Sequence, residues 1–486
     1  MKNITIILFG ATGDLSKRKI IPALYRFVAH KKLENFIIVG AAFDDVTADQ
    51  MINAARPFVQ SGDEDVWNTL RMNSYYKKIN FTEKDDYEEL NAFVQKCESS
   101  HRALEESPST SSGRAQEIDR KIELCKYNRL FYLATGSQFF CPITYHIARI
   151  GLLQRKEVRD AAWHRIVYEK PFGHDVKSAH EINECIKNTI NESQVYRIDH
   201  YLTKEVVSNI AMIRFTNCVL EPLWSNRYID QVQIILSESG GIEGRGMYYD
   251  TAGALRDVVQ NHMLEMLALV CMESPEKLTG DYIRAERVKV LEKVRFVDGI
   301  LGQYNGYASE KHVNPDSCTD TYASLKLAVD TPRWLGVPFY LKTGKCLNKK
   351  ETIIHIKFKQ VDCLLMRGCP MDSNWLTIQI APEAIFLLTL NAKVPGQAEQ
   401  VMPVGMEFCH SCLYGLQTPE AYEVLLEEIM RGEQSISVRF DEIEYAWKVI
   451  DVIEAQKLPV YQYAQGSTGP QEEKQHMEKH GMRWRT

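Results

Sequence analysis

The sequence lacks several features that would place the chain in a special class of proteins. It has no run of 18 apolar residues, so we expect no helix that crosses a membrane. It has no block of basic residues, and its formal net charge is −6, which argues against nucleic acid as a partner. Its first residues are too few for a secretory signal and lack a small-residue cleavage site. We therefore expect a cytoplasmic protein that binds neither membrane nor nucleic acid.

The sequence also lacks the paired cysteine spacings of a structural zinc site. Its 12 cysteines are scattered over 486 residues, unlike the dense cysteines of a small secreted scaffold. Cys409 and Cys412 have metal-like spacing, but no second pair has a similar spacing, so we attribute this one to chance. We predict free thiols in a reducing cytosol and no metal site.

Two patterns of apolar residues divide the chain. Up to about residue 200, helical stretches alternate with continuous apolar runs at 3–9, 36–42, 128–135 and 164–173. Buried parallel strands have this pattern, so we predict an α/β dinucleotide-binding (Rossmann-like) domain over 1–198. Later, polar and apolar residues alternate in the stretches 229–238, 320–329, 351–360, 375–382 and 385–391. Such strands bury one face, so we predict an α+β domain over 199–486 with a large, mainly antiparallel sheet.

A glycine turn follows the first expected strand, in the stretch GATGDLSKRK at 10–19. Glycine lets the backbone approach a pyrophosphate, and a helix N-terminus offers unpaired N–H groups and the positive end of a dipole. The spacing Gly10-x-x-Gly13 is not the commoner three-glycine form, and a plain strand-to-helix turn would have the same pattern. Alone, this stretch indicates dinucleotide binding only weakly.

Two further stretches gather charged residues. In YEKPFGHD at 168–175, Lys170 stands at the end of a strand, where parallel sheets face their ligand crevice, and the Lys–Pro bond that follows can be cis. An ordinary surface turn is the alternative.

The stretch RIDHYLTKE at 197–205 has six polar or ionisable side chains in nine positions. It fits either a solvated turn or the wall of a site that binds an anion and moves a proton.

A histidine lies in the mostly apolar helix expected over roughly 252–271. In such a setting, His262 would more often be a core residue than a base. Asp257 lies five residues earlier, too far around an α-helix to be an ideal neighbour. If His262 is a base, a carboxylate from elsewhere in the chain has to orient its ring.

Together these stretches resemble one family, glucose-6-phosphate dehydrogenase. The resemblance runs nearly end to end and includes EKPFG, RIDHYLTKE, EGRGMYYDTAGALRDVVQNH and YAQGSTGP. RIDHYLGKE is highly specific to that family, and Thr203 here replaces its glycine. The resemblance implies oxidation of β-D-glucose 6-phosphate at C1 to 6-phosphogluconolactone, with hydride transfer to a nicotinamide coenzyme, as the first step of the oxidative pentose phosphate pathway. It also implies a homodimer or homotetramer formed through the antiparallel sheet.

The resemblance further implies a role for each residue of the site. His262 would take the proton from the C1 hydroxyl, and Asp199 would orient its ring. A phosphate requires clustered donors and positive charge, and the residues implied to bind it are His200, Tyr201 and Lys204. Those implied to hold the sugar hydroxyls are Lys170, Glu238, Asp257, Lys345 and, as a further addition, Lys350. Those implied to contact the coenzyme are Gly10, Thr12, Gly13, Asp14, Leu15, Phe43, Asp44 and Lys170.

The sequence departs from the family pattern in the part expected to bind coenzyme. Family members usually read Gly-x-Ala-Arg after the second strand, and that arginine grips the 2′-phosphate of NADP, the family's usual coenzyme. Here Phe43 replaces the arginine, and Asp44 follows, where an acidic residue usually accepts from the ribose 2′-hydroxyl of NAD. NAD is therefore a plausible coenzyme. Three basic residues that begin the first helix could reach a 2′-phosphate instead: Lys17, Arg18 and Lys19.

Two other classes of protein stay open. A sugar oxidoreductase of the glucose-fructose oxidoreductase kind would share the general plan but would not need RIDHYLTKE. A catalytically dead nucleotide-binding sensor is the non-enzyme alternative. Loss of His262 or Asp199 would have favoured it, and both are present.

Overall fold

The computed structural model describes residues 3–59, 62–103, 127–155, 162–199, 201–360, 372–396, 400–409 and 420–485. The chain forms two compact units. Unit 1 comprises residues 1–173, 177–200 and 419–440, and unit 2 comprises residues 174–176, 201–418 and 441–486. The domain boundary at 198/199 stays a prediction.

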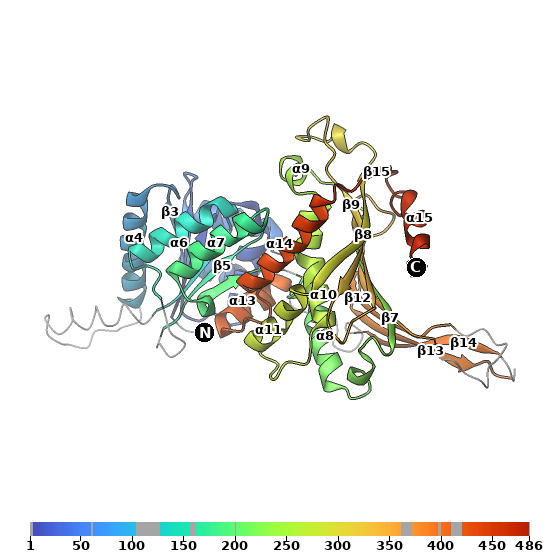
Figure 1. The fold of residues 1–486 in the computed structure, drawn as a ribbon. Coiled ribbons are helices and arrows are strands. Elements are labelled where there is room, and N and C mark those ends of the chain that lie inside the picture. The colour runs from blue at the N-terminus through green and yellow to red at the C-terminus, as the bar shows by residue number, and fades with distance from the viewer. Residues whose placement is uncertain are drawn as a thin grey trace. The chain divides into compact units, whose positions relative to one another are not determined.

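Unit 1 is built on a parallel sheet (Figure 1). Within the described residues its strands run in the order β3 (Ser74–Lys78), β2 (Phe36–Ala42), β1 (Ile4–Phe9), β4 (Asn128–Leu133), β5 (His164–Tyr168) and β6 (Val195–Arg197). All neighbouring strands pair in parallel. Every residue of β1 and β2 is buried, which explains their continuous apolar sequences.

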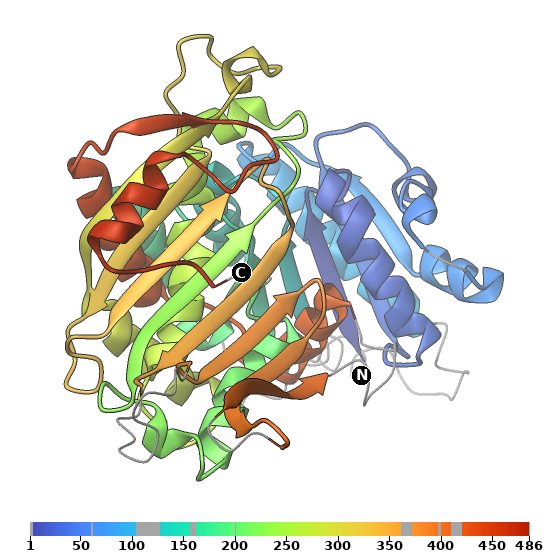
Figure 2. The same ribbon diagram turned by 90° about the vertical axis from the view of Figure 1, so that its right-hand side faces the viewer.

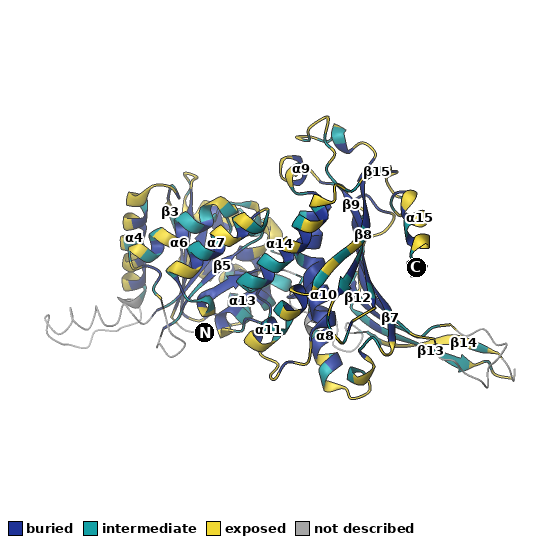
Figure 3. Cartoon of the chain, in the orientation of Figure 1, coloured by how far each residue is buried: buried dark blue, intermediate teal, exposed yellow. Residues whose placement is uncertain are grey.

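Helices cover both faces of this sheet. Alternate residues of β1 point to opposite faces, so Ile6 joins one core cluster and Ile7 the other. The first cluster takes in α1 (Ile21–Ala29), α2 (Ala48–Asn53), α3 (Glu64–Met72) and α13 (Ala421–Arg431). The second takes in α4 (Lys84–Ala103), α6 (Phe140–Arg149) and α7 (Val176–Thr189). Figure 3 shows exposed residues along the outer sides of α4, α6 and α7. The predicted Rossmann-like architecture is confirmed.

Unit 2 contains a large mixed sheet, which Figure 2 shows from its broad side. Its described strands run in the order β14 (Val401–Cys409), β13 (Ile385–Lys393), β12 (Trp375–Ala381), β11 (Glu351–Phe358), β7 (Ile229–Ser237), β10 (Pro338–Gly344), β9 (Tyr322–Val329), β8 (Val294–Tyr304) and β15 (Val460–Tyr463). The pairs β7–β10 and β8–β15 are parallel, and the others are antiparallel. The predicted α+β class with a mainly antiparallel sheet is confirmed.

The helices of unit 2 lie on the two faces of its sheet unequally. On one face lie α8 (Glu205–Thr216), α10 (Leu264–Cys271), α11 (Gly280–Leu291) and α14 (Phe440–Ala455), whereas α15 (Glu472–Lys479) lies on the other (Figure 1). None of the described helices has the length and apolar content that a membrane crossing requires.

The prediction that the cysteines are free thiols is wrong for Cys141, Cys185 and Cys409. Cys141 of α6 and Cys185 of α7 form a disulfide, with their Cα atoms 6.0 Å apart. The two cysteines are 44 positions apart on different helices, so no local spacing in the sequence reveals the pair. Cys409 is also disulfide-bonded. The described cysteines that are free are Cys97, Cys218, Cys271, Cys318 and Cys346. Cys412 of the metal-like pair lies outside the described residues.

Candidate active site

The glycine turn after β1 lies where the strand order of the unit 1 sheet reverses. β1 has β2 on one side and β4 on the other, and doubly wound sheets bind ligands beside the carboxyl ends of such strands. Gly10 has a φ of 75°, and a Cβ there would overlap the carbonyl oxygen of Ala134, just after β4. The Gly13 N–H and the Ser16 hydroxyl donate to the Gly10 carbonyl at 3.0 and 2.9 Å. Only glycine therefore fits this turn at position 10.

Asp44 connects the end of β2 to this turn. The Thr12 hydroxyl donates to the Asp44 carboxylate, and the Tyr76 hydroxyl donates to the Asp44 carbonyl at 2.7 Å. Burial, followed by the carboxylates of Asp44 and Asp45, raises the pKa of Tyr76 to about 12. The end of β2 therefore has a negative local potential, and the predicted coenzyme residues Thr12 and Asp44 are brought together.

Phe43 presents an aromatic surface beside this negative group. Its side chain is 45% exposed, and its ring packs against Phe81 at 4.4 Å and Phe139 at 5.8 Å between centroids. Phe139 comes from the stretch after β4, in which LATGSQFF replaces the family's usual proline pair. The position that holds an arginine in most family members therefore offers stacking area and no charge.

The three basic residues at the start of the first helix, Lys17, Arg18 and Lys19, differ in their ion-pair partners. Arg18 pairs with Asp14 at 2.6 Å, and Lys19 lies 4.0 Å from Glu420. The Lys17 ammonium has no ion-pair partner within the described part of unit 1. Leu15, also predicted to contact coenzyme, packs against the core that contains α1.

Lys170 and Asp199 follow neighbouring strands of the same sheet. β5 and β6 pair in parallel, so Lys170, just after β5, and Asp199, just after β6, come at the same edge. Lys170 is part-buried and precedes Pro171 through a cis peptide bond, while Asp199 is buried. Between them in sequence, the buried Arg197 guanidinium pairs with Glu192 at 2.6 Å, which fits a structural role.

Glu169 adds a second carboxyl at this edge. It accepts hydrogen bonds from Tyr132 at 2.5 Å and Tyr422 at 3.4 Å, and burial raises its pKa. Tyr422 is on α13, so the returning segment of unit 1 supplies part of the surroundings of the β5 end.

In unit 2, Asp257 and His262 lie on a π-helical segment, η7 (Leu255–Met263), and both are buried. A π-helix has i→i+5 hydrogen bonds, so residues five apart lie nearly one turn apart. The α-helical spacing that separated Asp257 from His262 in the sequence analysis is therefore wrong for this segment. The Asn261 side chain accepts from the His262 backbone N–H at 2.7 Å.

Asp320 holds the start of this π-helix. Its carboxylate accepts from the Leu255 N–H at 2.9 Å, and its carbonyl accepts from the Ala254 N–H at 2.8 Å. Gly253 has a φ of 64°, and a Cβ there would collide with the Asp320 carboxylate. Glycine at 253 therefore allows the close approach that fixes the helix bearing His262.

Tyr201 joins two of the predicted site residues of unit 2. Its ring lies 4.2 Å from the His262 ring, at an angle of 34°. The Lys204 ammonium lies 3.9 Å from the centroid of the Tyr201 ring. An ammonium, a phenol and an imidazole are thus stacked in series, which combines positive charge with hydrogen-bonding groups. His200, predicted to act with them, lies outside the described residues.

Glu238 and Lys345 form an ion pair at the ends of two parallel strands. Ser237 of β7 is in register with Gly344 of β10, so the residues that follow, Glu238 and Lys345, meet. The Lys345 ammonium also lies 5.1 Å from the Tyr249 ring centroid. Lys350 is exposed and comes just before Glu351, which pairs with Ser237 across β11 and β7.

Three residues around these groups were missed in the sequence analysis: Tyr248, Tyr249 and Asp320. Tyr248 donates to the Asp257 carboxylate at 3.4 Å, and burial, followed by Asp257, raises the pKa of its phenol. Tyr248 and Tyr249 fall in the stretch EGRGMYYDTAGALRDVVQNH, so the motif itself could have drawn attention to them. Asp320 lies far along the chain from η7 and has no such signal.

Comparison with known proteins identifies the family. The model "Glucose-6-phosphate dehydrogenase, NAD binding domain" matches residues 7–110 and 105–209, and "Glucose-6-phosphate dehydrogenase, C-terminal domain" matches residues 211–485. The chain belongs to the glucose-6-phosphate dehydrogenase family. The resemblance inferred from the motifs is thereby confirmed.

Relatives in the glucose-6-phosphate dehydrogenase family match over nearly their whole length. Glucose-6-phosphate 1-dehydrogenase of Chlamydia muridarum is 37% identical, with 99% of this chain and 96% of the relative covered. That of Bacillus subtilis is 36% identical, with 99% and 97% covered. A solved structure of glucose-6-phosphate dehydrogenase in complex with its substrate glucose-6-phosphate matches with a TM-score of 0.87 and 30% identity, over 100% of this chain and 99% of that one. Levoglucosan dehydrogenase, at 12% identity and a TM-score of 0.51, covers 94% of this chain and 98% of its own and shares the fold alone.

Proposed function

We propose that the protein oxidises β-D-glucose 6-phosphate at C1 to 6-phosphogluconolactone, with hydride transfer to a nicotinamide coenzyme. The observation that carries the proposal is the stacked series Lys204, Tyr201 and His262 in unit 2. This cluster contains a cation that would bind the substrate phosphate and a buried imidazole that would act on its C1 hydroxyl. Support comes from the substrate named for the solved relative in the same family.

In this proposal His262 is the general base. A ring nitrogen of His262 takes the proton of the C1 hydroxyl, and the coenzyme, when bound, accepts the hydride from C1. Tyr201 restricts the orientation of the imidazole through ring packing, and Asp320 fixes the start of its helix. We assign Asp199 to stabilise the imidazolium, on the strength of the family resemblance.

The remaining residues of unit 2 bind the sugar. We assign the phosphate to Lys204 and Tyr201, with His200 as a third donor, because phosphate oxygens favour clustered donors and positive charge. Glu238, Asp257 and Lys345 are assigned to the sugar hydroxyls, with Lys350 as a further contact and Lys170 from unit 1. Carboxylates suit that task because each accepts from several hydroxyls, and the Glu238–Lys345 pair holds both side chains in position.

Unit 1 binds the coenzyme in this proposal. The turn from Gly10 to Leu15 fits a pyrophosphate, because Gly10 leaves no Cβ and the helix begins directly after it. Thr12, Gly13 and Asp14 lie in the same turn.

We further propose that the enzyme uses NAD as well as, or better than, NADP. Asp44 accepts from Thr12 beside the turn, where it would also accept from a ribose 2′-hydroxyl. A 2′-phosphate carries roughly −1.5 to −2 charges and would be repelled by the carboxylates of Asp44 and Asp45. Two of the three nearby cations are already engaged, by Asp14 and Glu420.

We also propose a cytoplasmic location and a homodimer or homotetramer. Support for self-association comes from β14, an edge strand of the large sheet. Met402, Val404 and Met406 alternate along it and are exposed, so their side chains form an apolar strip on one face.

One assay tests the proposal. The purified protein is given glucose 6-phosphate with NAD or NADP, and the absorbance of reduced nicotinamide is followed. We expect turnover with glucose 6-phosphate and far less with free glucose. Absence of turnover with both coenzymes would contradict the proposed activity, and a strong preference for NADP would contradict only the proposed coenzyme choice.

A further inference from the structure

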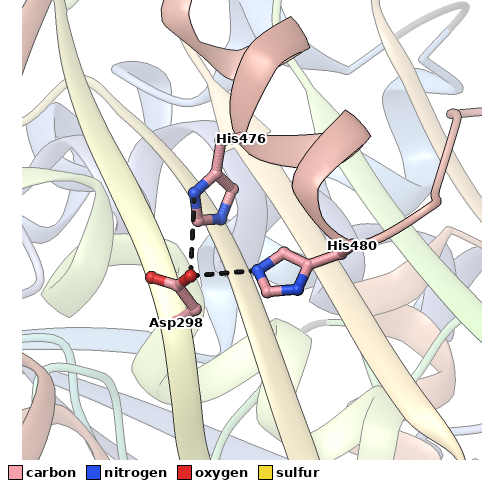
Figure 4. Close-up of side chains that lie close together, drawn as sticks. All are labelled: Asp298, His476 and His480. Carbon is pink, nitrogen blue, oxygen red and sulfur yellow. Dashed lines mark hydrogen bonds and ion pairs between the residues drawn. The ribbon is translucent and has the colours of Figure 1, made fainter.

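A cluster of two imidazoles and one carboxylate lies in unit 2, apart from every residue assigned above. His476 is on α15, His480 follows the last residue of that helix, and Asp298 is on β8. One candidate ligand atom from each residue lies within 4.8 Å of the other two. Figure 4 shows both imidazole rings pointing at the same oxygen of Asp298. The rings come from α15 and the residue after it, and α15 packs against the face of the sheet that contains β8.

We propose that Asp298, His476 and His480 bind a divalent transition-metal cation of the zinc class, with water as the fourth ligand. Two imidazole nitrogens and one carboxylate oxygen form a donor set that suits Zn²⁺. His480 Nε2 lies 3.0 Å from Asp298 Oδ2, and His476 Nδ1 lies 4.0 Å from it. Zinc bonds of about 2.0–2.1 Å put tetrahedral ligand atoms about 3.3–3.4 Å apart, so shifts of less than about 1 Å would form the site.

His476 provides an independent reason to expect a ligand. Its side chain is only 10% exposed. It donates and accepts no hydrogen bond within the described residues: its Nδ1 lies 4.0 Å from Asp298 Oδ2, beyond hydrogen-bond distance, and its Nε2, which the cation would not contact, is buried without a partner. Metal coordination at Nδ1 would give that nitrogen the partner it lacks. Its spacing from His480 is i, i+4, which places both rings on one side of the helix end.

Two ammonium groups occupy the surroundings of the proposed site. Lys479 Nζ lies 2.9 Å from Asp298 Oδ2, and Lys326 Nζ lies 3.1 Å from His480 Nδ1. An ammonium can only donate, so His480 Nδ1 accepts from Lys326 and Nε2 donates its proton to Asp298. A cation at Nε2 requires the ring proton to be on Nδ1 and Lys326 to move away. Lys479 is 69% exposed and can leave to solvent. The metal and the two lysines therefore compete.

The proposed cation would fasten α15 to the large sheet. The same helix carries Glu473, whose carboxylate accepts from Lys342 of β10 at 3.0 Å and from Tyr322 of β9. A metal bridge to β8 would add a third strand to these attachments. The expected effect of the metal is on stability of the C-terminal segment, because none of its ligands belongs to the proposed active site.

Calorimetric titration of metal-free protein with Zn²⁺ tests the proposal. We expect a class of binding sites that weakens by at least about 100-fold in the double variant His476→Gln, His480→Gln, since even residues around a metal's ligands contribute about 10–100-fold. Zn²⁺ should also raise the Tm of the unmodified protein more than that of the double variant. The matched control is His30→Gln, which removes an exposed imidazole from unit 1 and should leave Zn²⁺ binding unchanged.

Lys479→Gln provides a second variant that does not disturb a ligand. Removing the competing ammonium should tighten Zn²⁺ binding several-fold, a gain that a purely structural cluster would not show. Equal Zn²⁺ affinity in the double variant and the unmodified protein would overturn the proposal, because the cation would then bind elsewhere. Unchanged or weaker binding in Lys479→Gln would overturn it as well.

Discussion

The two units position their proposed functional groups in different ways. In unit 1 these groups follow the ends of parallel strands, and the backbone sets their geometry: Gly10 fits against Ala134, and Asp44 follows β2 directly. In unit 2 the groups are long side chains held by other side chains, as in the Glu238–Lys345 pair and the Lys204–Tyr201–His262 series. Unit 1 should therefore be most sensitive to changes of backbone conformation, and unit 2 to the loss of single charges or rings.

The largest effect is expected at His262. His262→Asn should lower kcat by about 10²–10⁴-fold and leave the affinity for glucose 6-phosphate nearly unchanged, because it removes a positioned base and keeps the helix. Steady-state kinetics measures both quantities, and His312→Asn changes an exposed histidine of the same unit as a control. A kcat close to that of the unmodified enzyme would show that His262 is not the base.

Loss of a single charge should act on binding. Lys204→Gln should raise KM for glucose 6-phosphate by roughly 10–100-fold, since hydrogen bonds to charged groups contribute about 1.5–3 kcal/mol. Reaction of free glucose should change little, because it has no phosphate. Lys349→Gln is the control, since Lys349 pairs with Glu351 at 2.9 Å. Equal losses for both sugars would assign Lys204 to the fold or to the chemistry.

The backbone-dependent site of unit 1 can be tested at Gly10. Gly10→Ala should weaken coenzyme binding by about 10-fold or more, because strained backbone costs of order 1–3 kcal/mol and the new Cβ overlaps Ala134. Gly151→Ala is a matched control: its φ is 77°, also positive, but a Cβ there meets nothing within 4 Å. Fluorescence titration with coenzyme compares the two. Similar losses in both variants would mean that φ alone, and not the close approach of β1 and β4, is responsible.

A smaller effect is expected for coenzyme choice. The double variant Phe43→Arg, Asp44→Ser should shift preference toward NADP by about 1–3 kcal/mol, the scale of one charge-assisted hydrogen bond. The measurement is the ratio of kcat/KM for the two coenzymes, before and after the change. If the unmodified enzyme already prefers NADP strongly, the positive charge of Lys17 outweighs Asp44, and the hypothesis fails.

The smallest effect concerns pH and the start of η7. Burial raises the pKa of Asp320 from 3.8 to about 6. A carboxyl with a higher pKa in the folded state stabilises the fold below its unfolded pKa, and this contribution is lost as pH rises through about 6. The free energy of unfolding of the unmodified protein should therefore fall between about pH 4 and pH 6, and more steeply than that of the variant Asp320→Asn. The asparagine does not titrate but keeps an oxygen that accepts from the Leu255 N–H. Urea unfolding across this range measures the slopes, and parallel slopes would contradict the prediction.

The sequence predicted the elements whose environment is uniform. β1 and β2 are buried on both faces and appear as apolar runs. β7 and β11 were found from their alternation, although nearly all of β7 and the middle of β11 are buried on both faces. β3, with the sequence SYYKK, was missed because its polar residues mask a strand at the edge of the sheet.

The site shows the same limit. The motifs predicted His262, Tyr201 and Lys204 as site residues, because the types and order of residues can be read from a sequence. The π-helical winding of η7 was not visible, since it depends on Asp320, a residue outside that helix. The pairing of Cys141 with Cys185 likewise depends on how two helices pack. Contacts between distant segments require the fold itself.

The return of the chain to unit 1 has a consequence for biosynthesis. Leu425, Leu426 and Ile429 of α13 belong to the same core cluster as Ile4 and Ile6 of β1. The ribosome synthesises residues 201–418 before it reaches α13. At about 5–20 residues per second, this stretch takes roughly 10–40 s. During this interval the part of the apolar core that α13 covers is exposed, although α1, α2 and α3 already lie on the same face of the sheet. The nascent chain should therefore bind chaperones until α13 emerges, and truncation before residue 420 should yield an aggregation-prone product.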